Sequence, residues 1–298
     1  MCKLAGWTSP APLSFAHAEA AVKAAHRVIR KTEKDGFGCA QNGYRTRHLT
    51  PAHYAGLHGV QTLRTRAGKG FTGLAIATTA ASEGRYNRHA GMVIHGRTAT
   101  CAVTLPNVHP FALKGWRLAH NGVISWNGPE TKLHAAATVD SQHLLIAIAT
   151  HHSNEARRAA LENITGYAAI IAIGPEGQMI VARDSTASLY AGITSRGRWL
   201  FGTTTEIVAA QADAMGAKGV VATSLDDWAW LEFTQGQRDP VVLDWHHERA
   251  STAHWSHAAR SIGHAGPGHQ GRFWEQTPKI EVSNTVDRFP DYEPGIPS

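Results

Sequence analysis

Cysteine stands at position 2, directly after the initiator methionine. Removal of Met1 would give Cys2 a free α-amine beside its own thiol, so that one residue carries both a nucleophile and a base. An α-amine has a pKa of about 8, and the unprotonated fraction at neutral pH can accept the thiol proton. The position therefore offers the chemistry of an N-terminal nucleophile. On position alone, a small residue near a frayed chain end is the alternative.

Short motifs that combine polar residues with glycine follow Cys2 in a set order. They are Asp35-Gly36-Phe37-Gly38-Cys39-Ala40, His95-Gly96-Arg97-Thr98-Ala99-Thr100, Leu118-Ala119-His120-Asn121-Gly122, Thr138-Val139-Asp140-Ser141, Ile164-Thr165-Gly166-Tyr167-Ala168 and Ala182-Arg183-Asp184. With Cys2 and in this order, over about residues 2–215, the chain resembles the class II glutamine amidotransferases, whose glutaminase domain uses an N-terminal nucleophile. No single motif is specific for this family, and the resemblance rests on the occurrence of all the motifs in this order.

The resemblance implies hydrolysis of the side-chain amide of L-glutamine. Cys2 would form a γ-glutamyl thioester and release ammonia, and water would then release glutamate. The tetrahedral intermediate carries an oxyanion, which needs preorganised donors. The resemblance assigns these donors to the Asn121 side chain and the Gly122 backbone N–H. Asn-Gly is also the strongest short signal for a type I′ turn, which is the alternative at this position.

Free glutamine must be bound through its α-carboxylate and its α-ammonium group. Arg97 offers a planar guanidinium for the carboxylate, and the hydroxyls of Thr98 and Thr100 are further donors nearby. Asp140 offers the opposite charge for the ammonium group. The alternatives are a surface arginine and a helix N-cap aspartate. The family often has an aromatic residue where Thr98 stands, so one wall of the glutamine pocket departs from its pattern.

The elements that must position these residues follow from hydrophobic periodicity. Helices are predicted over residues 14–36, 140–150, 156–164 and 206–215. Strands are predicted over residues 37–42, 73–79, 91–95, 117–119, 167–173, 179–183, 188–191 and 199–202. Strands and helices occur in groups, which favours an α+β fold with antiparallel sheets. The resemblance implies a four-layer αββα sandwich, with the active cysteine at the end of a central strand.

The composition changes near the C-terminal end. Residues 246–298 carry six His and five Pro but few aliphatic residues, and such a segment cannot bury enough surface to fold alone. We therefore predict a glutaminase domain over residues 2–232 and a His/Pro-rich extension over 233–298, partly docked or disordered. His254 and His257 have a spacing that could bind zinc, but no cysteine accompanies them, and neither a metal nor a cofactor is expected.

Composition and charge limit the cellular setting. Three cysteines, an odd and widely spaced set, fit reduced thiols, and Cys39 and Cys101 are expected in the core. No apolar run is long enough to span a bilayer and no secretory signal is evident, so we expect a cytoplasmic protein without a membrane partner. The net charge of +6 is dispersed over the chain, which makes nucleic acid a weakly supported partner.

Three functions remain open from the sequence. The first is a standalone glutaminase that supplies ammonia to a separate synthase, because too few residues follow the motifs to form an acceptor domain. The second is a hydrolase of γ-glutamyl amides or peptides. The third is a catalytically idle protein that keeps this fold for binding or structure.

Overall fold

The structure, a computed structural model, describes residues 2–33, 36–43, 89–98, 109–175, 177–234 and 237–245. Several predictions fall outside these ranges. They concern the strand at 73–79, the side chains of Thr100 and Cys101, and the residues from 246 onward.

The described residues form two antiparallel sheets of six strands each. In the first sheet the strands lie in the order β10 (Thr223–Ser224), β8 (Tyr190–Ile193), β9 (Trp199–Gly202), β1 (Lys3–Leu13), β3 (His89–Arg97) and β2 (Gly36–Gly43). In the second the order is β12 (Val241–Asp244), β11 (Ala229–Phe233), β7 (Met179–Arg183), β6 (Ile164–Ile173), β5 (Trp116–Trp126) and β4 (Phe111–Leu113). Strand β1 is interior, because it pairs with β3 on one side and with β9 on the other.

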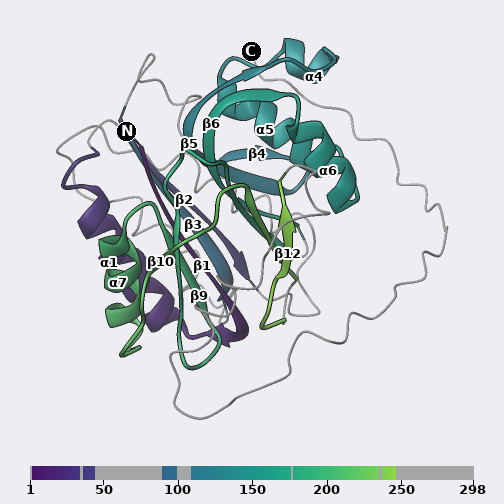
Figure 1. The fold of residues 1–298 in the computed structure, drawn as a ribbon. Coiled ribbons are helices and arrows are strands. Elements are labelled where there is room, and N and C mark those ends of the chain that lie inside the picture. Colours follow the sequence, from purple (N-terminus) through teal and green to yellow (C-terminus); the bar gives the residue numbers. More distant parts are fainter. Residues whose placement is uncertain are drawn as a thin grey trace, which may run out of the picture. The chain divides into compact units, whose positions relative to one another are not determined.

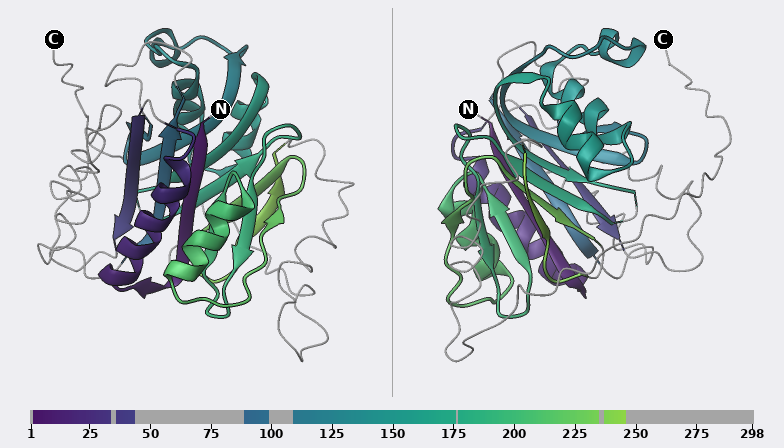
Figure 2. Two further views of the ribbon diagram at one scale, coloured as in Figure 1. Left: turned by 90° about the vertical axis from the view of Figure 1, so that its left-hand side faces the viewer. Right: turned by 45° about the vertical axis from the view of Figure 1, so that its right-hand side comes forward.

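Helices cover the outer face of each sheet (Figure 1). Helices α1 (Phe15–Ile29) and α7 (Thr205–Ala214) lie together against the first sheet, and Figure 2 shows them side by side in front of it. Helices α5 (Asp140–Ala149) and α6 (Asn154–Leu161) pack on the second sheet, and the short α4 (Lys132–Ala135) contacts α5. The order of layers is helix, sheet, sheet, helix, as predicted.

Alternation of side chains along the strands builds this arrangement. In β1, Ala5 and Trp7 pack with the apolar face of α1, whereas Leu4 points into the layer between the sheets. In β6, Ala169 and Ile171 meet Leu4 in that middle layer, while the alternate residues of the strand pack against α5. The alternating side chains of a single strand thus pack both between the two sheets and between a sheet and its helices.

Some boundaries differ from the predictions. The helix predicted over 14–36 ends at Ile29, because the chain must become extended by Gly36, where β2 begins to pair with Arg97. The strand predicted over 117–119 is the much longer β5. The helix predicted over 156–164 ends at Leu161, and β6 begins at Ile164. The domain boundary at residue 232 stays a prediction, although β12 adds residues beyond it to the second sheet.

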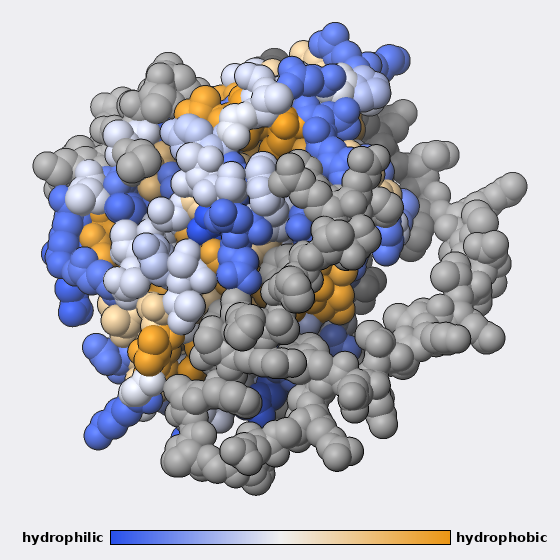
Figure 3. All heavy atoms as spheres, viewed as in Figure 1, coloured by the Kyte–Doolittle hydropathy of each residue, from blue (hydrophilic) through white to orange (hydrophobic). Residues whose placement is uncertain are grey.

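The described surface is mixed in polarity. On the face drawn in Figure 3, apolar residues form separate patches among hydrophilic ones. The exposed large apolar side chains of the described ranges are Val123, Leu133, Val221 and Val241. Within these ranges no helix is both long and apolar enough to cross a membrane.

Candidate active site

Cys2 lies at the start of the interior strand β1. The register pairs Lys3 with Gly96, which brings Cys2 next to Arg97 and Thr98 at the end of β3. The Cys2 Sγ donates a hydrogen bond to the carbonyl oxygen of Thr98 at 3.7 Å. Burial raises the pKa of the Cys2 thiol and the Glu33 carboxylate adds to this increase, whereas the hydrogen bond with Thr98 and the positive charges of the chain terminus and Arg97 oppose it. The thiol therefore needs a base to become a nucleophile at neutral pH.

Arg97 and Glu33 place opposite charges beside the thiol. Both side chains are buried, with 4% and 7% of their surface exposed. The Thr98 hydroxyl donates a hydrogen bond to Glu33 Oε2, and the Thr32 hydroxyl donates one to Glu33 Oε1 at 2.9 Å. The sequence interpretation did not single out Glu33. Its position among charged residues such as Lys31 and Lys34 is typical of a solvated segment, and no local signal predicts its burial.

Asn121 and Gly122 lie inside β5 and do not form a turn. They pair with Ala169 and Ala168 of β6 as part of an unbroken ladder, which excludes the type I′ turn. Asn121 is buried. A Cβ atom at position 122 would lie 2.0 Å from the Tyr167 carbonyl oxygen, so this close approach of the two strands requires glycine.

Asp140 is held against the same strand. Its Oδ2 accepts a hydrogen bond from the Ile124 backbone N–H at 3.1 Å, and its Oδ1 accepts one from the Ser141 N–H at 2.8 Å. Asp140 is the first residue of α5 and Val139 is the N-cap, so the N-cap alternative is displaced by one residue. The carboxylate therefore ties the start of α5 to β5 near Gly122.

Hydrogen bonds between side chains lead from Asp140 back to β5. The Ser141 hydroxyl donates to Asp140 Oδ1 at 3.2 Å, and His120 Nδ1 lies 2.9 Å from the same hydroxyl oxygen. Since the hydroxyl proton is directed to Asp140, the tautomer that fits carries a proton on His120 Nδ1. Sequence interpretation included His120 and Ser141 in motifs but gave them no role. Their contact becomes visible only when α5 and β5 are packed together.

Buried histidines connect the two halves of the site. The ring centroids of His95 on β3 and His109 are 4.2 Å apart, and those of His109 and His120 on β5 are 6.3 Å apart. Burial lowers the pKa of His95 to about 3, with further contributions from His120 and Arg97. Burial also lowers the pKa of His109 well below its ordinary value. Burial also lowers the pKa of His120, so all three imidazoles favour the neutral form.

The structure accordingly places the predicted residues in two groups. Cys2, Arg97 and Thr98 lie together at the end of the first sheet, whereas Asn121 and Gly122 lie in β5 of the second sheet, close to Asp140 at the start of α5. The roles of these residues stay predictions, and Thr100 lies outside the described ranges. Among the residues with described positions, no three His, Cys, Asp or Glu side chains are grouped in a way that could hold a metal ion.

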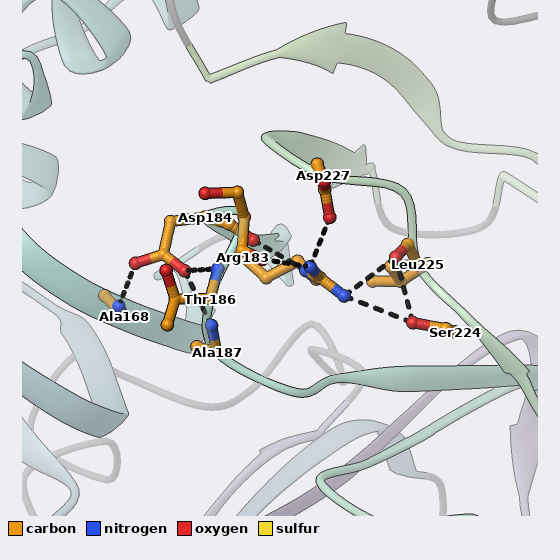
Figure 4. Close-up of polar contacts among 9 residues, drawn as sticks. Ala168, Arg183, Asp184, Thr186, Ala187, Ser224, Leu225 and Asp227 are labelled. Atoms are coloured by element: carbon orange, nitrogen blue, oxygen red, sulfur yellow. Dashed lines mark hydrogen bonds and ion pairs between the residues drawn. The ribbon is translucent and has the colours of Figure 1, made fainter.

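The last motif, Arg183-Asp184, forms a separate polar network (Figure 4). Asp184 accepts backbone hydrogen bonds from Ala168 at 2.5 Å, Thr186 at 2.6 Å and Ala187 at 2.7 Å. The Arg183 guanidinium donates to the carbonyls of Asp184 and Ser185, which directly follow it, and to acceptors on one further segment, namely the Leu225 carbonyl and the side chains of Ser224 and Asp227. We call this set the Arg183–Asp184 network, and its contacts join the end of β7 to the β6 strand and to the segment before β11.

Comparison with known proteins bears on the fold. No family model and no curated protein sequence matches this chain. Solved structures are similar to it, among them the following two. One is the glutamine phosphoribosylpyrophosphate (PRPP) amidotransferase from B. subtilis with ADP and GMP, at a TM-score of 0.50 and 14% identity over 83% of this chain and 50% of that chain.

The other is the allosteric regulatory enzyme of purine biosynthesis, at a TM-score of 0.52 and 16% identity over 83% of this chain and 49% of that chain. The present chain thus spans about half the length of each structure. At these identities the likeness concerns the fold alone. The resemblance to glutamine amidotransferases with an N-terminal nucleophile, first indicated by the motifs, is confirmed at the level of the fold.

Proposed function

We propose that this protein is a glutamine amidotransferase that hydrolyses the glutamine side-chain amide through a thioester on Cys2. The observation that carries the proposal is the position of the Cys2 thiol, which lies at the start of an interior strand beside a buried arginine and hydrogen-bonded to Thr98. A buried arginine next to a thiol suits a substrate that carries a carboxylate. The shared fold with a glutamine PRPP amidotransferase supports the same class of reaction.

The proposed reaction uses the α-amine of Cys2 as the base. The amine accepts the thiol proton while sulfur attacks the amide carbon, and the Asn121 side chain and the Gly122 N–H stabilise the oxyanion. The C–N bond then breaks, and the proton held by the amine leaves with ammonia. In the second half of the reaction, water attacks the thioester and the amine accepts one proton of that water. The C–S bond then breaks, glutamate is released, and the amine returns the proton to the sulfur of Cys2. Arg97 and Thr98, with Thr100, bind the α-carboxylate, and Asp140 binds the α-ammonium group.

The destination of the ammonia is part of the proposal. We propose that a separate synthase receives the ammonia. Purification of the tagged protein from its host with mass spectrometry of bound chains tests this point. Recovery of a synthase without a glutaminase domain of its own is the expected result, and recovery of none contradicts the partner proposal.

Glutamate release from L-glutamine tests the reaction. The Cys2→Ala variant is expected to lose at least about a thousandfold in kcat, as found when a covalent nucleophile is removed, while Cys39→Ala serves as the control for loss of a thiol. Intact mass must show that Met1 is absent from the active protein. Retained activity in Cys2→Ala overturns the proposal, and preference for a γ-glutamyl peptide over glutamine changes the substrate to that class.

A further inference from the structure

The carboxylate of Glu33 is buried, and within the described part of the chain its hydrogen bonds come from hydroxyl groups. Glu33 follows α1, where its backbone N–H donates to the Ile29 carbonyl oxygen at 3.0 Å. Its two carboxylate oxygens accept hydrogen bonds from the hydroxyls of Thr32 and Thr98. Burial of a carboxylate is costly, so these contacts indicate a specific function for the charge at this place.

The fold contains a feature that makes room for Glu33. A Cβ atom at position 96 would lie 2.1 Å from Ile29 Cγ2 and 3.1 Å from Glu33 Cβ. Only a residue without a side chain therefore allows the end of α1 to lie directly on β3. Gly96 precedes Arg97, and so the same short motif provides both the substrate-facing arginine and the space for Glu33.

Thr98 connects Glu33 with the thiol. Its hydroxyl donates to Glu33 Oε2, while its carbonyl oxygen accepts the hydrogen bond from Cys2 Sγ. Thr98 directly follows the last residue of β3, and among the described residues the pairing of β3 with β1 ends at Gly96 and that with β2 ends at Arg97. The Thr98 hydroxyl is bonded to Glu33 while its carbonyl oxygen accepts from Cys2, so Thr98 links the buried carboxylate to the thiol.

We propose that Glu33 is a positioning residue that acts through Thr98 to hold the Cys2 thiol in a fixed resting orientation. The catalytic meaning of this role rests on the proposed function, but the orientation itself does not. A buried thiol beside a carboxylate reacts slowly with small electrophiles, because burial and the nearby negative charge disfavour the thiolate. Loss of either side chain of the pair is expected to release the thiol.

Alkylation of Cys2 by iodoacetamide in the full chain, followed by peptide mass mapping, tests the proposal. Glu33→Ala and Thr98→Val are each expected to speed alkylation of Cys2 about threefold or more, because a change of half a pKa unit in a thiol has about this effect. If Glu33 acts through Thr98, the double variant is no faster than the faster single variant. Glu33→Gln and Thr98→Ser, which keep the hydrogen-bonding atoms, should restore much of the slow reaction.

Two internal references keep the result interpretable. Burial raises the pKa of Cys39 to about 12, so its alkylation reports unfolding of a variant, in which case the conservative variants decide the question. The exposed Glu130 provides the matched control Glu130→Gln, which should leave Cys2 alkylation unchanged. An unchanged rate in Thr98→Val, or additive effects in the double variant, overturns the positioning role.

Kinetics with glutamine separate this proposal from the proposed function. If both hold, Glu33→Ala lowers kcat more than it raises KM, since the thiol is misplaced while Arg97 still binds substrate. If the protein does not hydrolyse glutamine but the alkylation pattern is as expected, the proposed function fails and the positioning role stands. If hydrolysis is normal and alkylation of the variants is unchanged, the positioning role alone fails.

Discussion

The candidate active site and the Arg183–Asp184 network are both buried and charged, yet they differ in how their polar atoms are bonded. Asp184 and Arg183 reach backbone groups and side chains on several segments, and each contact is internal to the fold. In the candidate active site, by contrast, neither ring nitrogen of the buried His109 has a hydrogen-bond partner among the described residues. A saturated network is typical of structure, and an incompletely bonded one is typical of a place reserved for chemistry.

The largest effect is expected from Asp184→Ala. Three backbone N–H groups would lose their common acceptor, and we expect the free energy of unfolding to fall by about 3–5 kcal/mol. Urea unfolding monitored by circular dichroism measures this change. The exposed Asp213 on α7 offers the control Asp213→Ala, expected to cost below about 0.5 kcal/mol. Equal losses in both variants would remove the distinction between the network and an ordinary surface carboxylate.

In the candidate active site, Asn121→Ala should lower the rate of catalysis and leave the free energy of unfolding nearly unchanged. Loss of one oxyanion donor is expected to lower kcat by about 10²–10³-fold with little change in KM. Steady-state glutamate release gives both constants. Asn127→Ala changes an exposed asparagine directly after the same strand and should be as active as the unaltered protein. A normal kcat in Asn121→Ala would exclude the oxyanion role.

The buried histidines predict a pH effect of intermediate size. The folded pKa of His95 is about 3, below its unfolded value, so the unfolded state binds more protons as the pH drops below about 6.5. The free energy of unfolding should therefore fall between pH 7 and pH 5, by up to about 1.4 kcal/mol per pH unit for each such histidine.

Urea unfolding at several pH values checks this slope. His95→Gln should flatten it, whereas His152→Gln, at an exposed position, should not. If stability is independent of pH in this range, the histidine cluster is not held in a neutral buried form.

The smallest effect is expected at the edge of the Arg183–Asp184 network. Asp227 contacts the Arg183 Nη2 at 2.5 Å, but its side chain is 65% exposed. Water screens such a pair, and we expect Asp227→Asn to cost below about 1 kcal/mol by thermal or urea unfolding. A cost as large as that of Asp184→Ala would mean that the network depends on this ion pair, and its internal hydrogen bonds would then be secondary.

Much of the fold was accessible from sequence where short apolar runs lie between clear turns. Strands β7 and β9 occur at their predicted residues for this reason. Strand β1 was not predicted from its own residues, because Thr8, Ser9 and Pro10 interrupt the apolar pattern. Its pairing with β3 and β9 overrides that local signal, and only the family resemblance placed the cysteine at the end of a central strand.

In the candidate site, too, some features can be predicted from the sequence and others depend on tertiary packing. The types and order of Cys2, Arg97, Asn121 and Asp140 indicate a reaction from the sequence alone. Local sequence could not decide whether Asn121 lies in a turn or a strand, since the ladder with β6 determines this. Nor could it find Glu33, whose burial depends on Gly96, a residue of another strand.

The interior position of β1 has a practical consequence for handling the protein. Because hydrogen bonds to β3 and β9 fix this strand on both sides, any residues joined ahead of Cys2 begin at an anchored point next to the thiol. An affinity tag at that end would occupy the α-amine in a peptide bond and crowd the reactive sulfur. Recombinant material intended for activity measurements should therefore carry its tag at the opposite end or lose it by cleavage directly before Cys2.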